Sequence, residues 1–175
     1  MKSLIVSALC VLGLALTACS ESAGPEGPGP LRVENEARPG GPAVALEARV
    51  EGDRIVVDVV AHDVPELSGA AFRIAHPAWA KLESREVGKG WAPEAIHLVK
   101  NANDTEIALA DTVVGKKVGH PGGASQKLAT LTLRASEAPS AGDLGRLTIV
   151  PFRSELRDKE GAVVKVGVAG AKLTR

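Results

Sequence analysis

Residues 55–75, IVVDVVAHDVPELSGAAFRIA, decide the fold class of this chain. Their first part alternates two sets of mostly β-branched residues, which suit a pleated strand and crowd a helix. A short connector containing Pro65 follows, and Phe72 and Ile74 then alternate with small or charged residues, which indicates a second strand. Two successive strands without a helix between them predict an antiparallel, all-β chain.

The same alternation predicts further strands on both sides of this pair. Residues 51–54, EGDR, supply the turn that leads into the first of the two strands. Eight or nine short strands at near-regular spacing, with no convincing helix, predict a two-sheet antiparallel sandwich. The additional strands are expected at residues 43–51, 82–87, 95–99, 106–110, 127–134, 147–152 and 163–168, with 170–173 closing a sheet beside the first strand.

Two stretches between the strands are predicted to be irregular. Residues 115–126, GKKVGHPGGASQ, have no periodicity and are expected to form a surface loop. Residues 101–104, NAND, are expected to form a turn between two of the short strands.

Composition narrows the function classes. Hydrophobic residues make up 45% of the chain and charged residues 24%, which is ordinary for a globular domain. Lys plus Arg and Asp plus Glu both number 21, so no basic surplus is available to hold nucleic acid. Aromatic residues make up only 2%, and there is no Tyr, so we expect an aliphatic core.

The first 18 residues have the pattern of a secretory signal. A positive start at Lys2 precedes an apolar run that is short for a bilayer, and small residues end it. Leu16-Thr17-Ala18-Cys19 resembles the bacterial lipobox, in which cleavage leaves the cysteine N-terminal and acylated. Ser20 follows, and outer-membrane lipoproteins likewise lack Asp there. The resemblance implies a palmitate-type lipid anchor on Cys19 and the outer membrane of a Gram-negative bacterium.

Beyond the signal, the sequence predicts a chain without disulfides that consists of a tether and one folded domain. Cys10 would be removed with the signal and Cys19 would be acylated, so no thiol remains for a disulfide. Residues 19–42 are rich in Gly, Pro and Glu, and are predicted to form a disordered tether about 25 Å long on average. The folded domain is predicted to span residues 43–175.

The order of these strands resembles the cohesin family. The likeness rests on residues 63–69, DVPELSG, followed by the strand AAFRI at 70–74, a Pro-containing break and LES at 82–84. The late strand LATLTL at 128–133 and a C-terminal hairpin over 147–168 follow in the same order. His76 stands where the family commonly has Asp, and Leu133 where an aromatic residue is common.

The resemblance implies a nine-stranded jelly-roll sandwich that acts as a receptor. It would bind a small protein module such as a dockerin through one face of a sheet. The wider superfamily includes carbohydrate-binding modules on the same fold, which keeps polysaccharide open as a ligand.

The sequence offers little for catalysis or metal binding. His62, His76, His97 and His120 lack the spacing of a zinc motif, and solvated or capping roles are expected for them. Residues 101–104 carry too few carboxylates for a calcium loop. We therefore expect no catalytic residue, no metal site and no cofactor, and a chain that is not an enzyme.

Binding residues are sought on outward strand faces and among the aromatic side chains. Phe72 and Phe152 fall on apolar faces and are expected in the core, which leaves Trp79 and Trp91 as candidates for stacking on a sugar. A patch for a protein would use polar residues that we expect to project outward: Arg73, Glu83, Arg85, Lys100, Glu106 and Thr130 or Thr132. The sequence does not distinguish the two sheet faces.

The sequence thus predicts a lipid-anchored, exported, cohesin-like β-sandwich that binds a protein, dockerin-like or another envelope protein. Arg73 and Arg85 are the first candidates for that binding. The alternatives are a carbohydrate-binding module that uses Trp79 or Trp91, and a purely structural envelope lipoprotein. Contact with the membrane is expected through the N-terminal lipid only.

Overall fold

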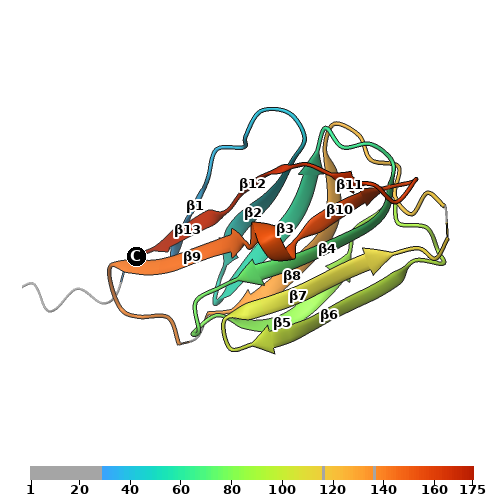
Figure 1. Cartoon of the computed structure of the whole chain (residues 1–175). Coiled ribbons are helices and arrows are strands. Elements are labelled where there is room, and N and C mark those ends of the chain that lie inside the picture. Colours follow the sequence, from blue (N-terminus) through green and yellow to red (C-terminus); the bar gives the residue numbers. More distant parts are fainter. Residues whose placement is uncertain (1–28, 116, 136) are drawn as a thin grey trace, which may run out of the picture.

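The computed structural model describes residues 29–175, except 116 and 136, as a sandwich of two sheets (Figure 1). The described part of the chain contains no α-helix, and therefore no helix that is long and apolar enough to cross a membrane. The strands are β1 (Arg32–Asn35), β2 (Ala43–Glu51), β3 (Arg54–His62), β4 (Leu67–Ala75), β5 (Lys81–Val87), β6 (Ile96–Asn103), β7 (Glu106–Thr112), β8 (Gln126–Arg134), β9 (Asp143–Ile149), β10 (Glu155–Asp158), β11 (Val163–Val164), β12 (Gly167–Ala169) and β13 (Ala171–Thr174), with a 3-10 turn η1 (Pro151–Arg153).

The smaller sheet has the order β12-β2-β3-β8-β5. β2 and β3 form a hairpin paired from Ala43↔His62 to Glu51↔Arg54. Gly52 takes a positive φ of 65° in the turn, as the tight connection requires. The long central pair is therefore the product of β-branched alternation and a glycine turn.

The larger sheet has the order β1-β13-β9-β4-β10-β11, and β7 and β6 extend it from the other edge of β4. The connector after β3 carries the chain from the smaller sheet to the larger, so β3 and β4 lie in different layers. β4 then pairs with β7 from Gly69↔Thr112 to Ala75↔Glu106. Figure 1 looks onto the outer side of this larger sheet.

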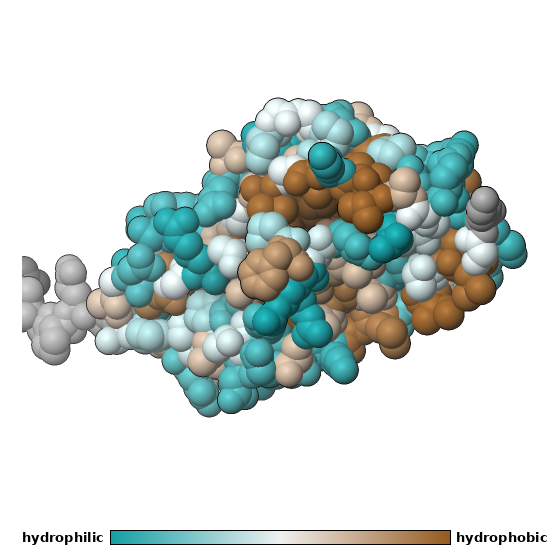
Figure 2. Space-filling model, viewed as in Figure 1, coloured by the Kyte–Doolittle hydropathy of each residue, from teal (hydrophilic) through white to brown (hydrophobic). Residues whose placement is uncertain are grey.

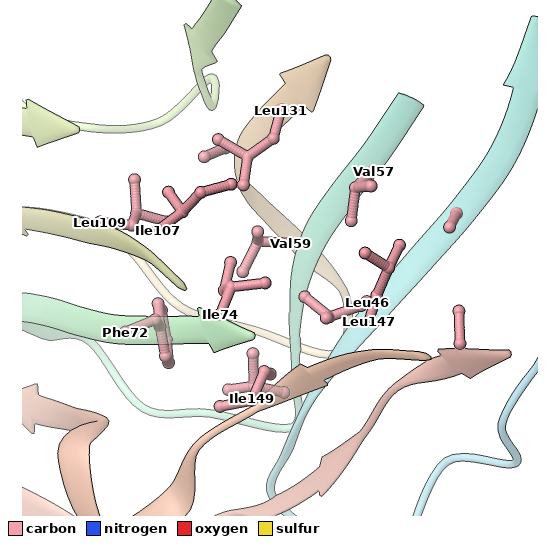
Figure 3. Close-up of a cluster of buried hydrophobic side chains, with 14 of the residues drawn as sticks. Leu46, Val57, Val59, Phe72, Ile74, Ile107, Leu109, Leu131, Leu147 and Ile149 are labelled. Carbon is pink, nitrogen blue, oxygen red and sulfur yellow. The ribbon is translucent and has the colours of Figure 1, made fainter. Parts of the chain in front are cut away.

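The core between the sheets is almost wholly aliphatic (Figure 3). The smaller sheet contributes residues such as Leu46, Val57 and Leu131, and the larger sheet contributes Ile74 and Leu109, all with 1% exposure. All these strands and the whole described core lie within residues 29–175. A fragment with these bounds therefore contains every element of the described fold.

The prediction of an all-β, two-sheet sandwich is confirmed, and the predicted tether is corrected in part. Residues 32–35, placed in the tether by composition, form β1 and pair with β13. The side chain of Asn35 bonds both backbone groups of Ala48, at 2.9 and 3.0 Å, which fixes β1 against β2. These hydrogen bonds order a segment for which the Gly- and Pro-rich composition alone predicts disorder. The predicted signal, residues 1–18, and Cys19 lie outside the described residues.

The C-terminal region differs from the prediction in three places. Residues 170–173 were expected beside the strand 43–51, but β13 pairs with β1 and β9 in the larger sheet, and β12 is the neighbour of β2. The strand expected over 147–152 ends at Ile149, because Pro151 begins the 3-10 turn η1. Phe152 on this turn is 82% exposed, so its expected place in the core is wrong. The strand expected over 163–168 is divided into β11 and β12, which belong to different sheets.

The segment 115–126, predicted to be a surface loop, is attached to the rest of the fold. Backbone bonds of 2.8 and 3.0 Å between Leu67 and His120, and of 3.2 and 2.8 Å between Val64 and Gly123, attach this segment to the start of β4. His120 is fully buried, and His62 and His76 are buried too, so the solvated alternative is wrong for these three. His120 Nδ1 accepts a hydrogen bond from the Gly122 N–H at 3.1 Å, which is a capping role. Burial lowers the pKa of His120, so its ring is neutral at pH 7.

Candidate functional site

The outer side of the larger sheet is largely apolar where β4, β7 and β6 lie side by side. Phe72 and Ile74 of β4 and Leu109 of β7 point into the core, so their sequence neighbours point outward. In the register of the sheet, Ala71 lies beside Ala110 and Ala110 beside Leu98. We call this surface the β4–β7–β6 face; it is formed by Gly69, Ala71, Arg73, Ile96, Leu98, Lys100, Ala108, Ala110 and Thr112.

Small side chains at the centre of this face leave room for a partner's side chains. A shallow depression of about 210 Å³ is lined by Gly69, Ala71, Ala110 and Thr112, with Glu155 and Arg157 on β10 beside them. Next to it, Leu98 is 62% and Ile96 49% exposed. Figure 2 shows brown, apolar surface over the ends of β6 and β7 at its right side. A contiguous exposed apolar patch of this kind is typical of an interaction site.

Among the described residues, the carboxylates at the β4–β7–β6 face form ion pairs, whereas two of its cations do not. Glu106 binds Arg153 at 3.2 Å, and Glu155 binds Arg157 at 2.8 Å. Arg73 and Lys100 lie on either side of Ala108 in the register. In the part of the chain that the structure describes, neither of these two cations forms an ion pair, so the face carries uncompensated positive charge.

The outer side of the smaller sheet is different, because more of its charges are paired within the molecule. Asp58 binds Arg49 and Lys127, each at 3.0 Å. Although burial opposes it, hydrogen bonds from Thr130 and Lys127 hold the pKa of Asp58 below its ordinary value. A partner would have to compete with these ion pairs.

A second network on the same side has the same character. Glu83 lies between Arg54 and Arg134, at 2.8 Å from each. Their hydrogen bonds lower the pKa of Glu83 to about 2. The two outer sides of the sandwich thus differ in how many of their charges are paired, which the sequence did not reveal.

A buried polar cluster lies directly beneath this face. Asp111 of β7 is fully buried and accepts a hydrogen bond from the Arg85 guanidinium of β5, whose side chain is 5% exposed. His97 Nδ1 lies 2.7 Å from the same Asp111 oxygen. Arg85 also donates to the Leu98 carbonyl oxygen at 3.2 Å. The cluster links the edge of one sheet to the strands that form the face on the other.

Arg85 was expected to project outward, and that expectation is wrong. A register shift between Leu82 and Ser84 in the pairing of β5 with β8 adds one residue to the strand. Leu82 and Arg85 consequently both lie opposite inward-facing residues of β8, and the arginine points between the sheets. Alternation along the sequence does not predict side-chain direction beyond such a bulge, because the extra residue moves every following side chain to the opposite face of the sheet.

The two tryptophans are each held by a hydrogen bond to a backbone carbonyl. Trp79 Nε1 donates to the Leu144 carbonyl oxygen at 3.1 Å, and Trp91 Nε1 donates to the Leu128 carbonyl oxygen at 3.1 Å. Both are half-buried and pack on the core. The structure does not bring Trp79 and Trp91 together as one platform, and their use in sugar binding stays a prediction.

The remaining site predictions divide as follows. Arg73, Lys100 and Glu106 lie on the outward side of the larger sheet, as expected, and their role in binding stays a prediction. Thr130 lies on the opposite side of the sandwich, where it binds Asp58. Within the described residues, no three His, Cys, Asp or Glu side chains gather in a way that would hold a metal ion.

Sequence reasoning missed the apolar part of the face, above all Leu98 and Ile96. A signal was present in the alanines at 71, 108 and 110. A solvated strand surface usually carries larger polar side chains at its outward positions. Recognising it requires the register that places these alanines side by side, and only the structure supplies that register.

Comparison with family models finds no match, and comparison with curated proteins finds none. Solved structures of cohesin modules are similar in fold. The sixth cohesin of scaffoldin B from Acetivibrio cellulolyticus, solved in complex with a mutant Cel5 dockerin, has a TM-score of 0.61 at 16% identity over 74% of this chain and 95% of that one. A cohesin module of a family 33 glycoside hydrolase from Clostridium perfringens has a TM-score of 0.55 at 11% identity over 79% and 97%.

A cohesin from Clostridium acetobutylicum, studied in solution, gives a TM-score of 0.57 at 17% identity, over 75% of this chain and 90% of that one. The identities are low, so the likeness concerns the fold. This chain therefore has a cohesin-like fold, as the order of its strands had indicated.

Proposed function

We propose that this chain is a non-catalytic module that binds a partner protein through the β4–β7–β6 face. The observation that carries the proposal is the contrast between the two outer sides. One carries networks of ion pairs within the molecule, such as Asp58 with Arg49, and the other exposes Leu98 and Ile96 beside several alanines. The cohesin-like fold supports this reading, because similar modules have been solved with dockerins bound.

The chemistry of the face describes the partner. An apolar strip would pack over Ala110 and Leu98, and carboxylates beside it would meet Arg73 and Lys100. Charge complementarity of this kind chiefly governs the association rate and the choice of partner, whereas the buried apolar contacts supply most of the affinity. A dockerin-like helical module or another envelope protein with such a surface would fit.

The first experiment uses the fragment 29–175 as bait for an envelope extract, followed by binding measurements with the purified partner. Leu98→Asp should weaken binding by about 30-fold, which corresponds to about 2 kcal/mol for the loss of a central apolar contact. Val87→Asp is the matched control, because Val87 is 43% exposed on β5 of the other sheet and should leave binding unchanged.

Two results would contradict the proposal. One is a captured partner whose affinity is the same for the wild type and for Leu98→Asp. The other is binding to a glycan array that is abolished by Trp91→Ala, which would favour the carbohydrate-binding alternative. A fragment that captures nothing would favour the structural alternative.

We also propose that the protein is exported and lipid-anchored at Cys19 in the outer membrane. The lipobox-like Leu16-Thr17-Ala18-Cys19 after an apolar run supports this. Metabolic labelling with palmitate should mark the wild type, and Cys19→Ser should abolish the label and move the protein out of the outer-membrane fraction. Labelling of the serine variant at the level of the wild type would contradict the assignment.

A further inference from the structure

A second apolar surface lies on the same side of the sandwich, where the larger sheet is interrupted. β9 pairs with β4 only at Ile74 and Ala75, and the chain then leaves the sheet as η1 before β10 rejoins β4. The interruption leaves a groove of about 220 Å³. The residues that line it include Phe72, Ile149, Val164, Val166 and Val168. Figure 2 shows it as a brown hollow above η1.

A protruding aromatic side chain lies beside this groove. Phe152 is 82% exposed on η1, next to Pro151, which lines the groove. Arg153 lies over its ring at 5.3 Å, and no core residue covers it. Val163 is 56% exposed and also lines the groove. A chain with two phenylalanines thus leaves one of them in solvent beside an unfilled apolar hollow.

We propose that this surface binds a second copy of the same chain, with Phe152 of each copy inserted into the groove of the other. A two-fold interface uses the same patch on both copies, so it needs a projection and a recess side by side on one surface. Phe152 and the groove meet this requirement. An unrelated partner that filled the groove would leave Phe152 exposed unless it brought a second pocket.

The charges at the rim agree with a two-fold arrangement. Lys165 and Glu155 both line the groove and carry opposite charges, so a two-fold axis between them can bring each lysine opposite the other copy's carboxylate. Within the described residues, Lys165 has no ion pair, whereas Glu155 holds Arg157. The patch is small, so we expect a weak dimer that depends on concentration.

The inference does not depend on the proposed partner binding, and its test is separate. Sedimentation equilibrium of the fragment 29–175, from about 10 μM to about 1 mM, should show reversible dimerisation. Phe152→Ala and Val163→Asp should each raise the dissociation constant by at least about tenfold. Both residues are exposed, so circular dichroism should show the wild-type fold. Val87→Asp, on the far edge of the other sheet, should dimerise like the wild type.

The amide NMR signals of the fragment, followed on dilution, provide a second measurement. We expect the largest shifts at Val164, Val166 and Val168. A wild type that stays monomeric over the whole range would overturn the inference. Dimerisation of Phe152→Ala equal to that of the wild type, or an equal loss in Val87→Asp, would also overturn it. Leu98→Asp should dimerise normally, which separates this surface from the β4–β7–β6 face.

Discussion

Asp111→Ala should lower the free energy of unfolding of the fragment 29–175 by about 3–5 kcal/mol, as measured by chemical denaturation. The Asp111 carboxylate is fully buried and is the charge partner of the Arg85 guanidinium, which is itself 5% exposed. Removal of the carboxylate leaves a cation between the sheets with no counter-charge. Burial of an unpaired charge is among the largest single-residue penalties known in folded proteins.

A double variant separates the unpaired charge from a general loss of packing. Arg85→Met together with Asp111→Leu removes both charges and fills the space with apolar atoms, and it should stay within about 1 kcal/mol of the wild type. If the double variant is as unstable as Asp111→Ala, or if Asp111→Ala loses less than about 1 kcal/mol, the cluster does not tie the sheets together as described.

Gly122→Ala should lower the free energy of unfolding by about 3 kcal/mol. Gly122 has a φ of +66°, and a Cβ at this position would lie 2.0 Å from the Pro65 carbonyl oxygen. The segment 115–126 would have to move away from the start of β4. It would then lose the backbone bonds between Leu67 and His120 and expose the buried imidazole.

Gly115→Ala provides a matched control in the same segment. Gly115 also has a positive φ, +87°, but no atom lies within 4 Å of the position that a Cβ would take. Only the backbone strain remains, and we expect a loss of about 1 kcal/mol. Equal losses for the two variants would show that the segment does not depend on close contact with β4.

The fold was predictable from sequence where a strand is long and its alternation is unbroken. β2 and residues 129–134 of β8 are such stretches, and each has one side in the core. The prediction failed where local rules are overridden. The bulge in β5 turns Arg85 inward, the Pro151 turn carries Phe152 out of the core, and β1 is held by Asn35 within a stretch of disordered composition.

The candidate face was only partly predictable, for a physical reason. Arg73 and Lys100 could be placed on an outward side by alternation alone. The decisive property is the neighbourhood of Ala71, Ala110 and Leu98, which come from three different strands. Likewise, the ion pairs of Asp58 and Glu83 on the opposite side depend on cross-strand register.

The most direct test of partner binding at this face is a cross-saturation NMR measurement on the isotope-labelled fragment 29–175 in complex with its captured partner. Saturation of the unlabelled partner should reduce the amide signals of β4, β6 and β7, with the largest effects near Ala71, Leu98 and Ala110. The amides of β2, β3 and β8 should keep their intensity. The largest losses on β2, β3 and β8, with β6 and β7 unaffected, would contradict the account.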